Sequence, residues 1–381
     1  METIQIDPQR QRRAKEYARL QRRVSVGSML VGGLYVIAWL ALGWAVTVRT
    51  ALAARIDSPW LLVAAFAVVF GGISALLDLP MEYYTGFVLP HQYGQSNQTL
   101  SGWVGDQVKS LLISLPLGLG LLELIYTLLR AAPETWWLWV ALVLIGFSVL
   151  MSNLAPVLIM PIFYRVVPLG EERADLVDRL TRLAERAGTR VRGVFQIDMS
   201  RRTKSANAAM MGLGNTRRIV LGDTLIGEFS DDEIETVMAH ELGHHVHRDL
   251  PLGILVEGVL TLVGLALAAL VLRLGVSEFH LQSPADPASL PLLALAMGAY
   301  GLVTMPLGNA FSRWRERRAD QYALRMTGNG AAYASALARL ANQNLSDADP
   351  EPWVEWLFYS HPALGKRIRM AQEWGNQPSS G

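Results

Sequence analysis

Six apolar stretches, each close to 20 residues long, constrain this chain more than any other feature. They cover residues 26–48, 60–80, 108–129, 136–158, 251–274 and 289–311. A helix of about 20 apolar residues crosses the hydrocarbon core of a bilayer. The composition agrees, because 51% of the residues are hydrophobic and only 18% are charged. The sequence therefore predicts an α-helical integral membrane protein with about six transmembrane helices.

The distribution of basic residues predicts how these helices are oriented. Residues 1–23 carry seven Lys or Arg, whereas the short loops between later stretches, at 49–59, 130–135 and 275–288, carry few. By the positive-inside rule, the N-terminus lies in the cytosol. Six spans return the C-terminus to the same side. We therefore expect a multi-pass protein of the plasma membrane or inner membrane whose active site faces the cytosol.

The clearest chemical motif is His240-Glu241-Leu242-Gly243-His244. Two imidazoles four residues apart share one face of a helix and can bind one zinc ion. Glu241 can then reach a water molecule at the open coordination position, as in metalloproteases. Ser230 and Glu233 have the spacing of a capping box, which predicts a helix that begins near residue 231 and carries the motif in its interior.

A third zinc ligand must come from another part of the chain, because catalytic zinc usually has three protein ligands. Thiolates are excluded, since the chain has no cysteine. His247 lies on the correct face, but three ligands in line along a straight helix cannot converge on one tetrahedral ion. Glu316 and Asp320 are four residues apart, so one carboxylate can bind the metal while the other orients a histidine. Such a pair is also common on a solvated helix face.

Further segments accompany these motifs. They are His91-Gln92-Tyr93-Gly94-Gln95-Ser96-Asn97-Gln98, Ser205-Ala206-Asn207-Ala208, Glu316-Arg317-Arg318-Ala319-Asp320, and Ser360-His361-Pro362 with Arg367. Together, from about residue 60 to 370, they resemble the type I CAAX prenyl endopeptidases, a family of integral-membrane zinc proteases.

The resemblance implies a fold, a cofactor and a set of roles. The expected fold is a ring of about six helices around an aqueous chamber, with a small cytosolic α+β metalloprotease domain of the gluzincin-like type, HExxH plus Glu. One zinc ion per chain is expected. The implied roles are zinc binding by His240, His244 and Glu316, general base catalysis by Glu241, ligand orientation by Asp320, oxyanion support by His361 and Arg367, and substrate alignment on a sheet edge by Asn207 and Ala208.

The predicted organisation follows from these assignments. It comprises a basic cytosolic N-terminus (1–25), four transmembrane helices (26–158) with a family-like loop (81–107), a catalytic domain (159–250), two further helices (251–311), a C-terminal catalytic part (312–375) and a disordered tail (376–381). Within the catalytic domain, periodicity predicts a helix over 171–187 and short strands at 194–197 and 219–221.

The expected function is a membrane-embedded zinc metalloendopeptidase. Its expected partners are membrane lipid and a peptide or protein substrate, possibly membrane-anchored or prenylated. A net charge of +1 gives no reason to expect nucleic acid. His245 stands where the family commonly has tryptophan, which leaves prenyl specificity open. The alternatives are a heat-shock-type quality-control protease and, from another class, a membrane scaffold or transporter with structural zinc. Glu241 argues against the last, because a structural site needs no base.

Overall fold

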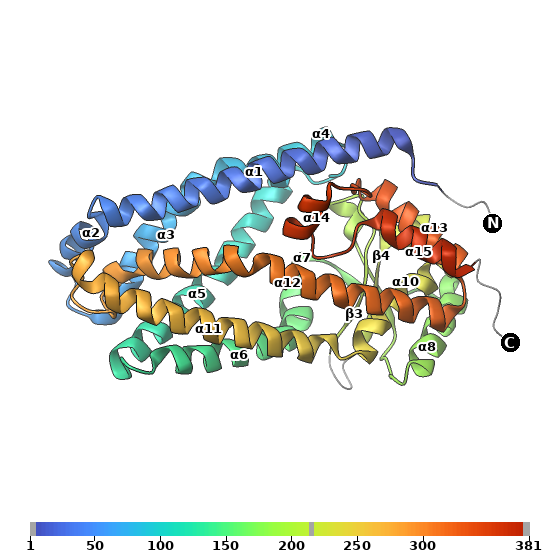
Figure 1. Ribbon diagram of the computed structural model, residues 1–381. Helices are drawn as coiled ribbons and strands as arrows, with labels where there is room; N and C mark the ends of the chain where they lie inside the picture. The colour runs from blue at the N-terminus through green and yellow to red at the C-terminus, as the bar shows by residue number, and fades with distance from the viewer. Residues whose placement is uncertain (1–4, 213–216, 376–381) are drawn as a thin grey trace.

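The computed structural model describes residues 5–212 and 217–375. Within these residues, six helices are long and apolar enough to cross a membrane, and they run side by side along the molecule (Figure 1). They contain α1 (Pro8–Ala41), α3 (Pro59–Tyr83), α5 (Leu100–Ala131), α6 (Trp136–Leu154), α11 (Asp249–Glu278) and α12 (Leu290–Thr327). The predicted number of spans is confirmed. The predicted tail at 376–381 lies outside the described residues.

Helix α1 differs from its predicted span at both ends. It already begins at Pro8, where the Asp7 side chain accepts hydrogen bonds from two backbone N–H groups. The basic segment is therefore the first part of the spanning helix. The helix ends at Ala41, and Gly43, with φ of 67°, turns the chain into α2 (Trp44–Ala53). A left-handed glycine stops a helix without steric strain, so the span ends before the predicted residue 48.

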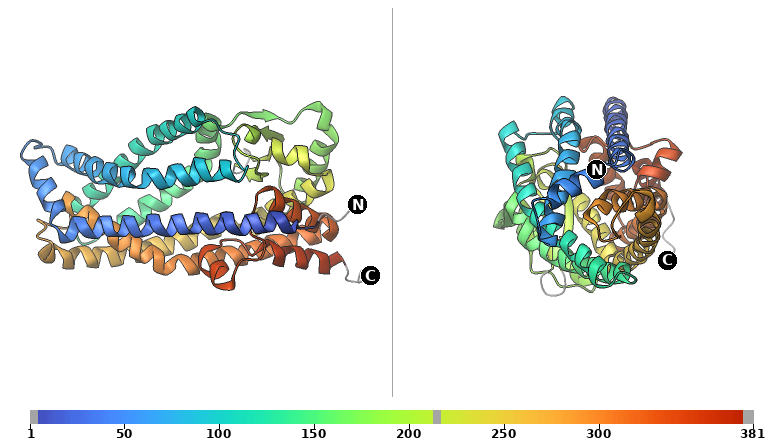
Figure 2. Two further views of the ribbon diagram at one scale, coloured as in Figure 1. Left: turned by 90° about the horizontal axis from the view of Figure 1, so that it is seen from above. Right: turned by 90° about the vertical axis from the view of Figure 1, so that its left-hand side faces the viewer.

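The spanning helices form one layer around a central region, which is visible in the end-on view (Figure 2). The most apolar window of each span has at most 28% of its residues buried. A compact bundle would bury one face of every helix, whereas a single-layer ring leaves an inner and an outer face uncovered. This arrangement has the inner face that a chamber needs, and the chamber itself stays a prediction.

The segments predicted to be catalytic, 159–250 and 312–375, contain a small mixed sheet with the strand order β1-β2-β4-β3, and they are called the catalytic part below. Strands β2 and β4 are parallel, and the two outer pairs are antiparallel. The strands are β1 (Val166–Pro168), β2 (Val194–Ile197), β3 (Ala208–Met211) and β4 (Arg218–Gly222). The two strands and the helix predicted from periodicity are confirmed. Strand β3 lies at the edge of the sheet, as the resemblance implied for this segment.

Helices cover this sheet and complete the catalytic part. The longer ones are α8 (Ala174–Arg186), α10 (Asp231–Val246), α13 (Gly330–Gln343) and α15 (Leu364–Gly375). The short ones are α9 (Asp223–Glu228) and α14 (Pro352–Phe358). In contrast, α4 (Leu89–Gln92) and α7 (Met160–Phe163) are the last turns of the candidate spans that contain α3 and α6. Buried Leu180, Ile219, Ile234 and Leu337 belong to one hydrophobic core. That core holds α10 and the C-terminal helices together, although about 80 residues of membrane-spanning chain separate them.

The family-like segment after α4 attaches the membrane helices to the catalytic part. Asp106, on α5, accepts two hydrogen bonds from the Arg202 guanidinium, at 2.7 and 3.0 Å. The Asn97 side chain donates to the Ser200 carbonyl oxygen at 2.9 Å. A bidentate arginine–carboxylate pair fixes orientation as well as distance. This segment therefore positions the chain that leads into β3.

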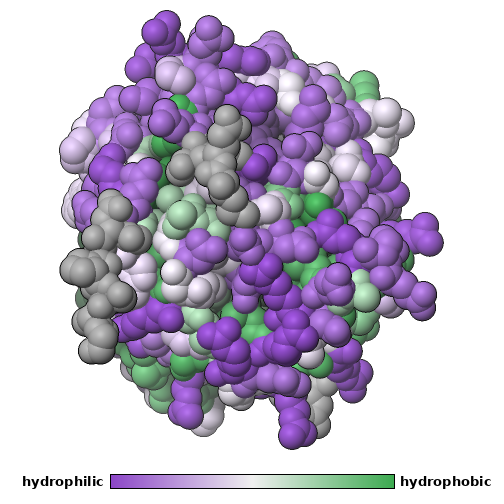
Figure 3. Space-filling model, turned by 90° about the vertical axis from the view of Figure 1, so that its right-hand side faces the viewer, coloured by the Kyte–Doolittle hydropathy of each residue, from purple (hydrophilic) through white to green (hydrophobic). Residues whose placement is uncertain are grey.

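The two ends of the molecule differ in surface character. The end formed by the catalytic part is mostly hydrophilic (Figure 3). In contrast, the spans expose large apolar side chains, including Leu112 on α5 and Val303 on α12, which are 69% and 76% exposed. Exposed apolar surface on this scale needs a lipid environment. Both described chain ends lie with the hydrophilic part (Figure 1).

Candidate metal centre

Helix α10 positions the first two candidate ligands. Ser230 and Glu233 form the predicted capping box, in which each side chain bonds to the backbone N–H of the other residue. The helix therefore begins at Asp231, as predicted, and the motif lies in its C-terminal half. Nε2 of His240 and Nε2 of His244 are 3.2 Å apart. The two imidazoles thus point at one place from neighbouring turns.

Helix α12 brings the third candidate ligand to the same place. The Glu316 carboxylate lies 3.3 Å from Nε2 of His240 through Oε2, and 3.3 Å from Nε2 of His244 through Oε1. Among the described residues, this trio has the composition and spacing of a metal site. His247 is not part of the trio, and its ring packs against Tyr322 instead. Of the two carboxylates left open by the sequence, Glu316 is thus the one that joins the histidines.

The dimensions of this triangle suit a tetrahedral ion. Metal–ligand bonds of about 2.0–2.1 Å at tetrahedral angles separate two ligand atoms by about 3.3–3.4 Å. The observed separations are 3.2 and 3.3 Å. In addition, Oε2 of Glu316 is buried and accepts no hydrogen bond from any described residue. A buried carboxylate oxygen without a partner is costly, and a cation at the triangle would satisfy it.

Each histidine is held by a carboxylate behind it. Nδ1 of His240 lies 2.9 Å from the Asp320 carboxylate, and Nδ1 of His244 donates to Asp249 at 2.8 Å. A carboxylate that accepts from Nδ1 leaves the Nε2 lone pair free for a metal. Asp320 therefore has the geometry predicted for it. Asp249, at the start of α11, has the same geometry for the second histidine and was not predicted.

A buried cluster fixes Asp320 in turn. The Arg367 guanidinium donates to both of its carboxylate oxygens, at 2.9 and 2.6 Å. The Tyr333 hydroxyl donates to the same carboxylate at 2.5 Å. Asp320 is fully buried, and Arg367 is nearly so. Arg367 therefore touches the orienting carboxylate, which lies on the far side of His240 from the metal position. Tyr333, on α13, was not predicted.

His361 reaches the metal position from the opposite side. Its Nε2 lies 3.2 Å from Oε1 of Glu316, while 59% of its side chain stays exposed. The loop that carries it is held by Arg313, whose guanidinium donates to the carbonyl oxygens of Glu355 and Tyr359 at 3.0 and 2.6 Å. His361 is thus an accessible hydrogen-bond donor beside the candidate ligands.

A cavity of about 600 Å³ adjoins the metal position. Glu241 and His244 line it, together with Met210 and Gly212 at the end of the edge strand β3. Asn207 and Ala208, which were predicted to align substrate, are not among its lining residues. The Asn207 side chain accepts a hydrogen bond from the Ala208 backbone N–H at 2.9 Å. In this structure, the end of β3, rather than its start, shares the cavity with the candidate base.

The electrostatic environment favours a bound cation. Burial lowers the pKa of the His240 imidazole, but the neighbouring carboxylates of Asp320 and Glu316 outweigh burial and raise the pKa to about 9. A site that stabilises a proton on a buried imidazole also stabilises a metal ion. Burial raises the pKa of the Glu241 carboxyl above its ordinary value. A higher pKa makes a carboxylate a better proton acceptor.

Gly243, between the two ligand histidines, has a packing role. A Cβ atom at this position would lie 3.0 Å from Cα of Ala319 on α12. A side chain at this position would crowd the α12 backbone, so glycine favours the close approach of α10 and α12 that lets Glu316 reach both imidazoles. This packing role of Gly243 could not be predicted from the motif itself. The position of Asp249, five residues after His244, is a signal that could have been used.

The fold and this site define a membrane-embedded metallopeptidase. Residues 3–165 match the family described as the CAAX prenyl protease N-terminal region with five membrane helices, and residues 171–375 match peptidase family M48. The chain belongs to peptidase family M48. Four of the six candidate spans lie within the first matched region.

Related proteins agree with this assignment. The chain is 32% identical to the uncharacterized metalloprotease YhfN of Bacillus subtilis, over 85% of this chain and 76% of that protein. It is 31% identical to CAAX prenyl protease 1 of Saccharomyces cerevisiae, over 80% of this chain and 70% of that protein. The crystal structure of S. mikatae Ste24p has the same fold, with a TM-score of 0.86 and 24% identity, and the match covers 97% of this chain and 92% of that one.

Proposed function

We propose that this protein is a zinc endopeptidase that cuts unstructured peptides or membrane-associated proteins, and that one zinc ion is held by His240, His244 and Glu316. The ligand triangle carries the proposal, because its dimensions fit tetrahedral zinc and its donors are those that zinc prefers. When bound, zinc would supply a Lewis acid that polarises the peptide carbonyl and acidifies a water molecule.

The remaining chemistry belongs to side chains of this chain. Glu241 lies on the cavity wall beside His244, where it can take a proton from the attacking water and pass it to the leaving amine. His361 can donate a hydrogen bond to the oxyanion, since it is exposed and borders Glu316. Nε and Nη2 of Arg367 both donate to Asp320, and Nη2 also donates to the Tyr333 hydroxyl. We therefore assign it as a positioning residue for the Asp320–His240 pair, rather than as a direct oxyanion donor.

The sheet edge offers a way to align a substrate. Among the described residues, strand β3 pairs with β4 on one side only, and an extended peptide can add to a free edge through backbone hydrogen bonds. Asn207 and Ala208 start this strand, and Met210 lies at the cavity. Recognition through the backbone accepts many sequences. Selectivity would then depend on whether a chain is unfolded and can reach the edge.

Peptide hydrolysis by the purified protein tests this function. We expect cleavage of unprenylated, unstructured peptides, with farnesylation lowering the apparent KM more than it raises kcat. The reason is that each buried methylene group of a lipid chain contributes about 0.8 kcal/mol to membrane association, which concentrates the substrate. Matched peptides with and without farnesyl in detergent would give both constants.

Two outcomes would change the proposal. If only the farnesylated peptide is cut, and always after the modified cysteine, the protein is a dedicated CAAX processing enzyme. That outcome would agree with the name of the relative from S. cerevisiae, CAAX prenyl protease 1. If misfolded membrane proteins are degraded at many sites, the quality-control alternative holds. A metal chelator and the Glu241→Gln variant serve as controls for both peptides.

We further propose that the membrane boundary lies where the catalytic part meets the ring, with that part in the cytosol. On α12, the exposed large aliphatic side chains end at Leu307, and the next exposed large apolar side chain is that of Trp314. Just beyond them, the Asn309 side chain donates to the Leu357 carbonyl oxygen of α14 at 2.6 Å. Helix α14 exposes Trp353 and Trp356, by 62% and 58%. Tryptophan is enriched at membrane interfaces, so α14 would rest in the headgroup layer.

Cysteine labelling tests the orientation, because the chain has no native cysteine. Arg12→Cys lies on the exposed N-terminal part of α1, and Gln282→Cys lies in the exposed turn between α11 and α12. In intact cells, an impermeant maleimide should label only the variant at 282. Both variants should be labelled after lysis. Labelling at 12 in intact cells would place the metal centre on the outer face.

A further inference from the structure

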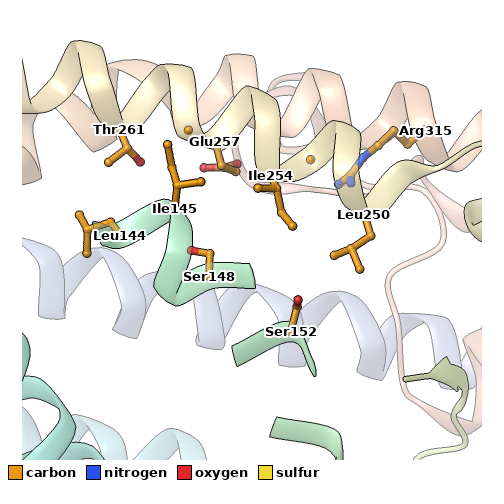
Figure 4. A pocket seen from close by; sticks show the side chains of 11 residues that line it. Leu144, Ile145, Ser148, Ser152, Leu250, Ile254, Glu257, Thr261 and Arg315 are labelled. Atoms are coloured by element: carbon orange, nitrogen blue, oxygen red, sulfur yellow. The ribbon is translucent and has the colours of Figure 1, made fainter. Parts of the chain in front are cut away.

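A second cavity, of about 300 Å³, lies between α6 and α11 close to the catalytic part. Polar side chains from three helices face it: Ser148 and Ser152 from α6, Glu257 from α11 and Arg315 from α12 (Figure 4). Leu250 lines both this cavity and the catalytic cavity. The two spaces therefore adjoin at the start of α11.

The second cavity faces the inside of the ring. On α11, Leu255 and Val259 are 63% and 54% exposed and lie one turn apart, and Glu257 is exposed on another side of the helix. Because the ring leaves both its faces uncovered, the chemistry of the side chains decides which side faces lipid. Glu257 lies two residues from each, so it is about 200° around the helix from them. A carboxylate that faced lipid at this depth would be costly. The cavity is thus reached from the interior, where a substrate would lie, and not from the bilayer.

The Arg315 guanidinium lines this cavity, and some of its N–H groups have no hydrogen-bond acceptor among the described residues. Its Nη1 donates to the Asp249 carbonyl oxygen at 3.2 Å, but its buried Nε has no hydrogen-bond partner among the described residues. A Cβ atom at Gly253 would lie 3.0 Å from the same Nη1. The glycine therefore leaves the space through which the guanidinium passes α11. A guanidinium has five N–H donors in a planar fork, and a structural contact to one carbonyl oxygen leaves most of them available.

The two charged residues of the lining lie at different points along α11. Arg315 lies against Gly253, and Glu257 follows one helical turn later. The end of the cavity near Leu250 and the catalytic cavity is therefore positive, and the far end is negative. An anionic group that enters from the metal centre therefore meets the Arg315 guanidinium first. Glu257 repels it from the far end of the cavity.

We propose that this cavity is a subsite in which Arg315 binds a carboxylate of the peptide substrate. The proposal rests on the peptidase function above. A carboxylate matches the planar fork of a guanidinium with two parallel hydrogen bonds. Both the C-terminal carboxylate of a short substrate and an acidic side chain supply this group. Binding along the sheet edge recognises only the peptide backbone. The subsite would add a preference for substrates that carry an anion at a fixed distance from the cut bond.

A peptide series measures this preference directly. The peptides share one cleavage region and carry tails of one to six residues after the cut bond, each made as a free acid and as an amide. A second set has amidated tails with a single Glu or Gln at each position. In the wild-type protein, kcat/KM for acid over amide, or for Glu over Gln, should reach at least about tenfold at one tail length, the scale of a charge-assisted hydrogen bond.

Three variants assign the preference to the cavity. Arg315→Gln should bring the acid-to-amide ratio close to one, and Arg315→Lys should leave an intermediate ratio because the charge stays and the fork is lost. Glu257→Gln should raise the ratio, since it removes the nearby negative charge. The exposed Arg317 lies two residues away on α12, and Arg317→Gln, which removes the same charge, should leave the ratio unchanged.

The ratio separates this proposal from the function on which it rests. The amide peptides report general damage to the active site in every variant, and the zinc content is measured alongside. If no peptide is cut by the wild-type protein, the proposed function fails. If amides and acids are cut equally at all tail lengths, or if Arg315→Gln keeps the wild-type ratio, only the subsite is wrong and Arg315 serves to hold the Asp249 carbonyl.

Discussion

Replacing Glu241 by Gln should abolish hydrolysis while the protein keeps its zinc. The carboxylate lines the catalytic cavity next to His244 but lies outside the ligand trio, so the amide should leave metal binding intact. An amide cannot accept a proton from water, and loss of a general base costs about 10² to 10⁴ in rate. We expect kcat to fall at least about a hundredfold, measured on an unprenylated peptide with zinc content determined on the same sample.

The comparison is informative because the two side chains have nearly the same shape. Loss of zinc together with activity would mean that Glu241 holds the metal or a neighbouring ligand. Activity within a few fold of the wild type would mean that another group accepts the proton. Either result would remove Glu241 from the role that its position in the motif predicts.

Replacing Glu316 by Ala should have the opposite signature, with zinc lost first. Glu316 is the only described carboxylate that contacts Nε2 of both histidines. Loss of an outer partner of a metal ligand typically weakens binding by about 10- to 100-fold, and loss of a ligand should exceed that range. Competition with a chelator at limiting zinc would measure the affinity, and Asp249→Asn and Asp320→Asn would give the smaller outer-partner effect for comparison.

His247→Ala is the matched control for the alternative ligand. It should keep the wild-type zinc affinity, because His247 packs against Tyr322 and not against the trio. Full zinc retention by Glu316→Ala, together with zinc loss by His247→Ala, would contradict the ligand set that the structure brings together.

The sequence predicted those features that depend on local pattern. Span number follows from hydropathy, and the start of α10 follows from a capping box, so both are visible in a single segment. The motif supplied two ligands and chemistry required a third, for which the spacing favoured Glu316 or Asp320, and the family resemblance implied Glu316. The sequence therefore predicted which side chains belong to the site, because each of them lies in a recognisable local motif.

The supporting contacts could not be predicted, because they depend on how separate helices pack. Tyr333 lies on α13 and meets Asp320 only after α12 and α13 fold against α10. Gly243 matters because of Ala319 on another helix. Arg315 gives no signal of its own, since it is one of several arginines in a polar run. Contacts between elements far apart in sequence have no local periodicity that reveals them.

The separation of the ligands along the chain has a consequence for biogenesis. The two histidines lie before α11, and Glu316 lies at the end of α12. Both helices must therefore cross the bilayer, and the chain must turn back at the far face, before the third ligand can meet the first two. Until that point, the ribosome and the insertion machinery hold a chain with an incomplete metal centre. With this ligand set, proteolytic activity would begin only after α11 and α12 are inserted in the membrane.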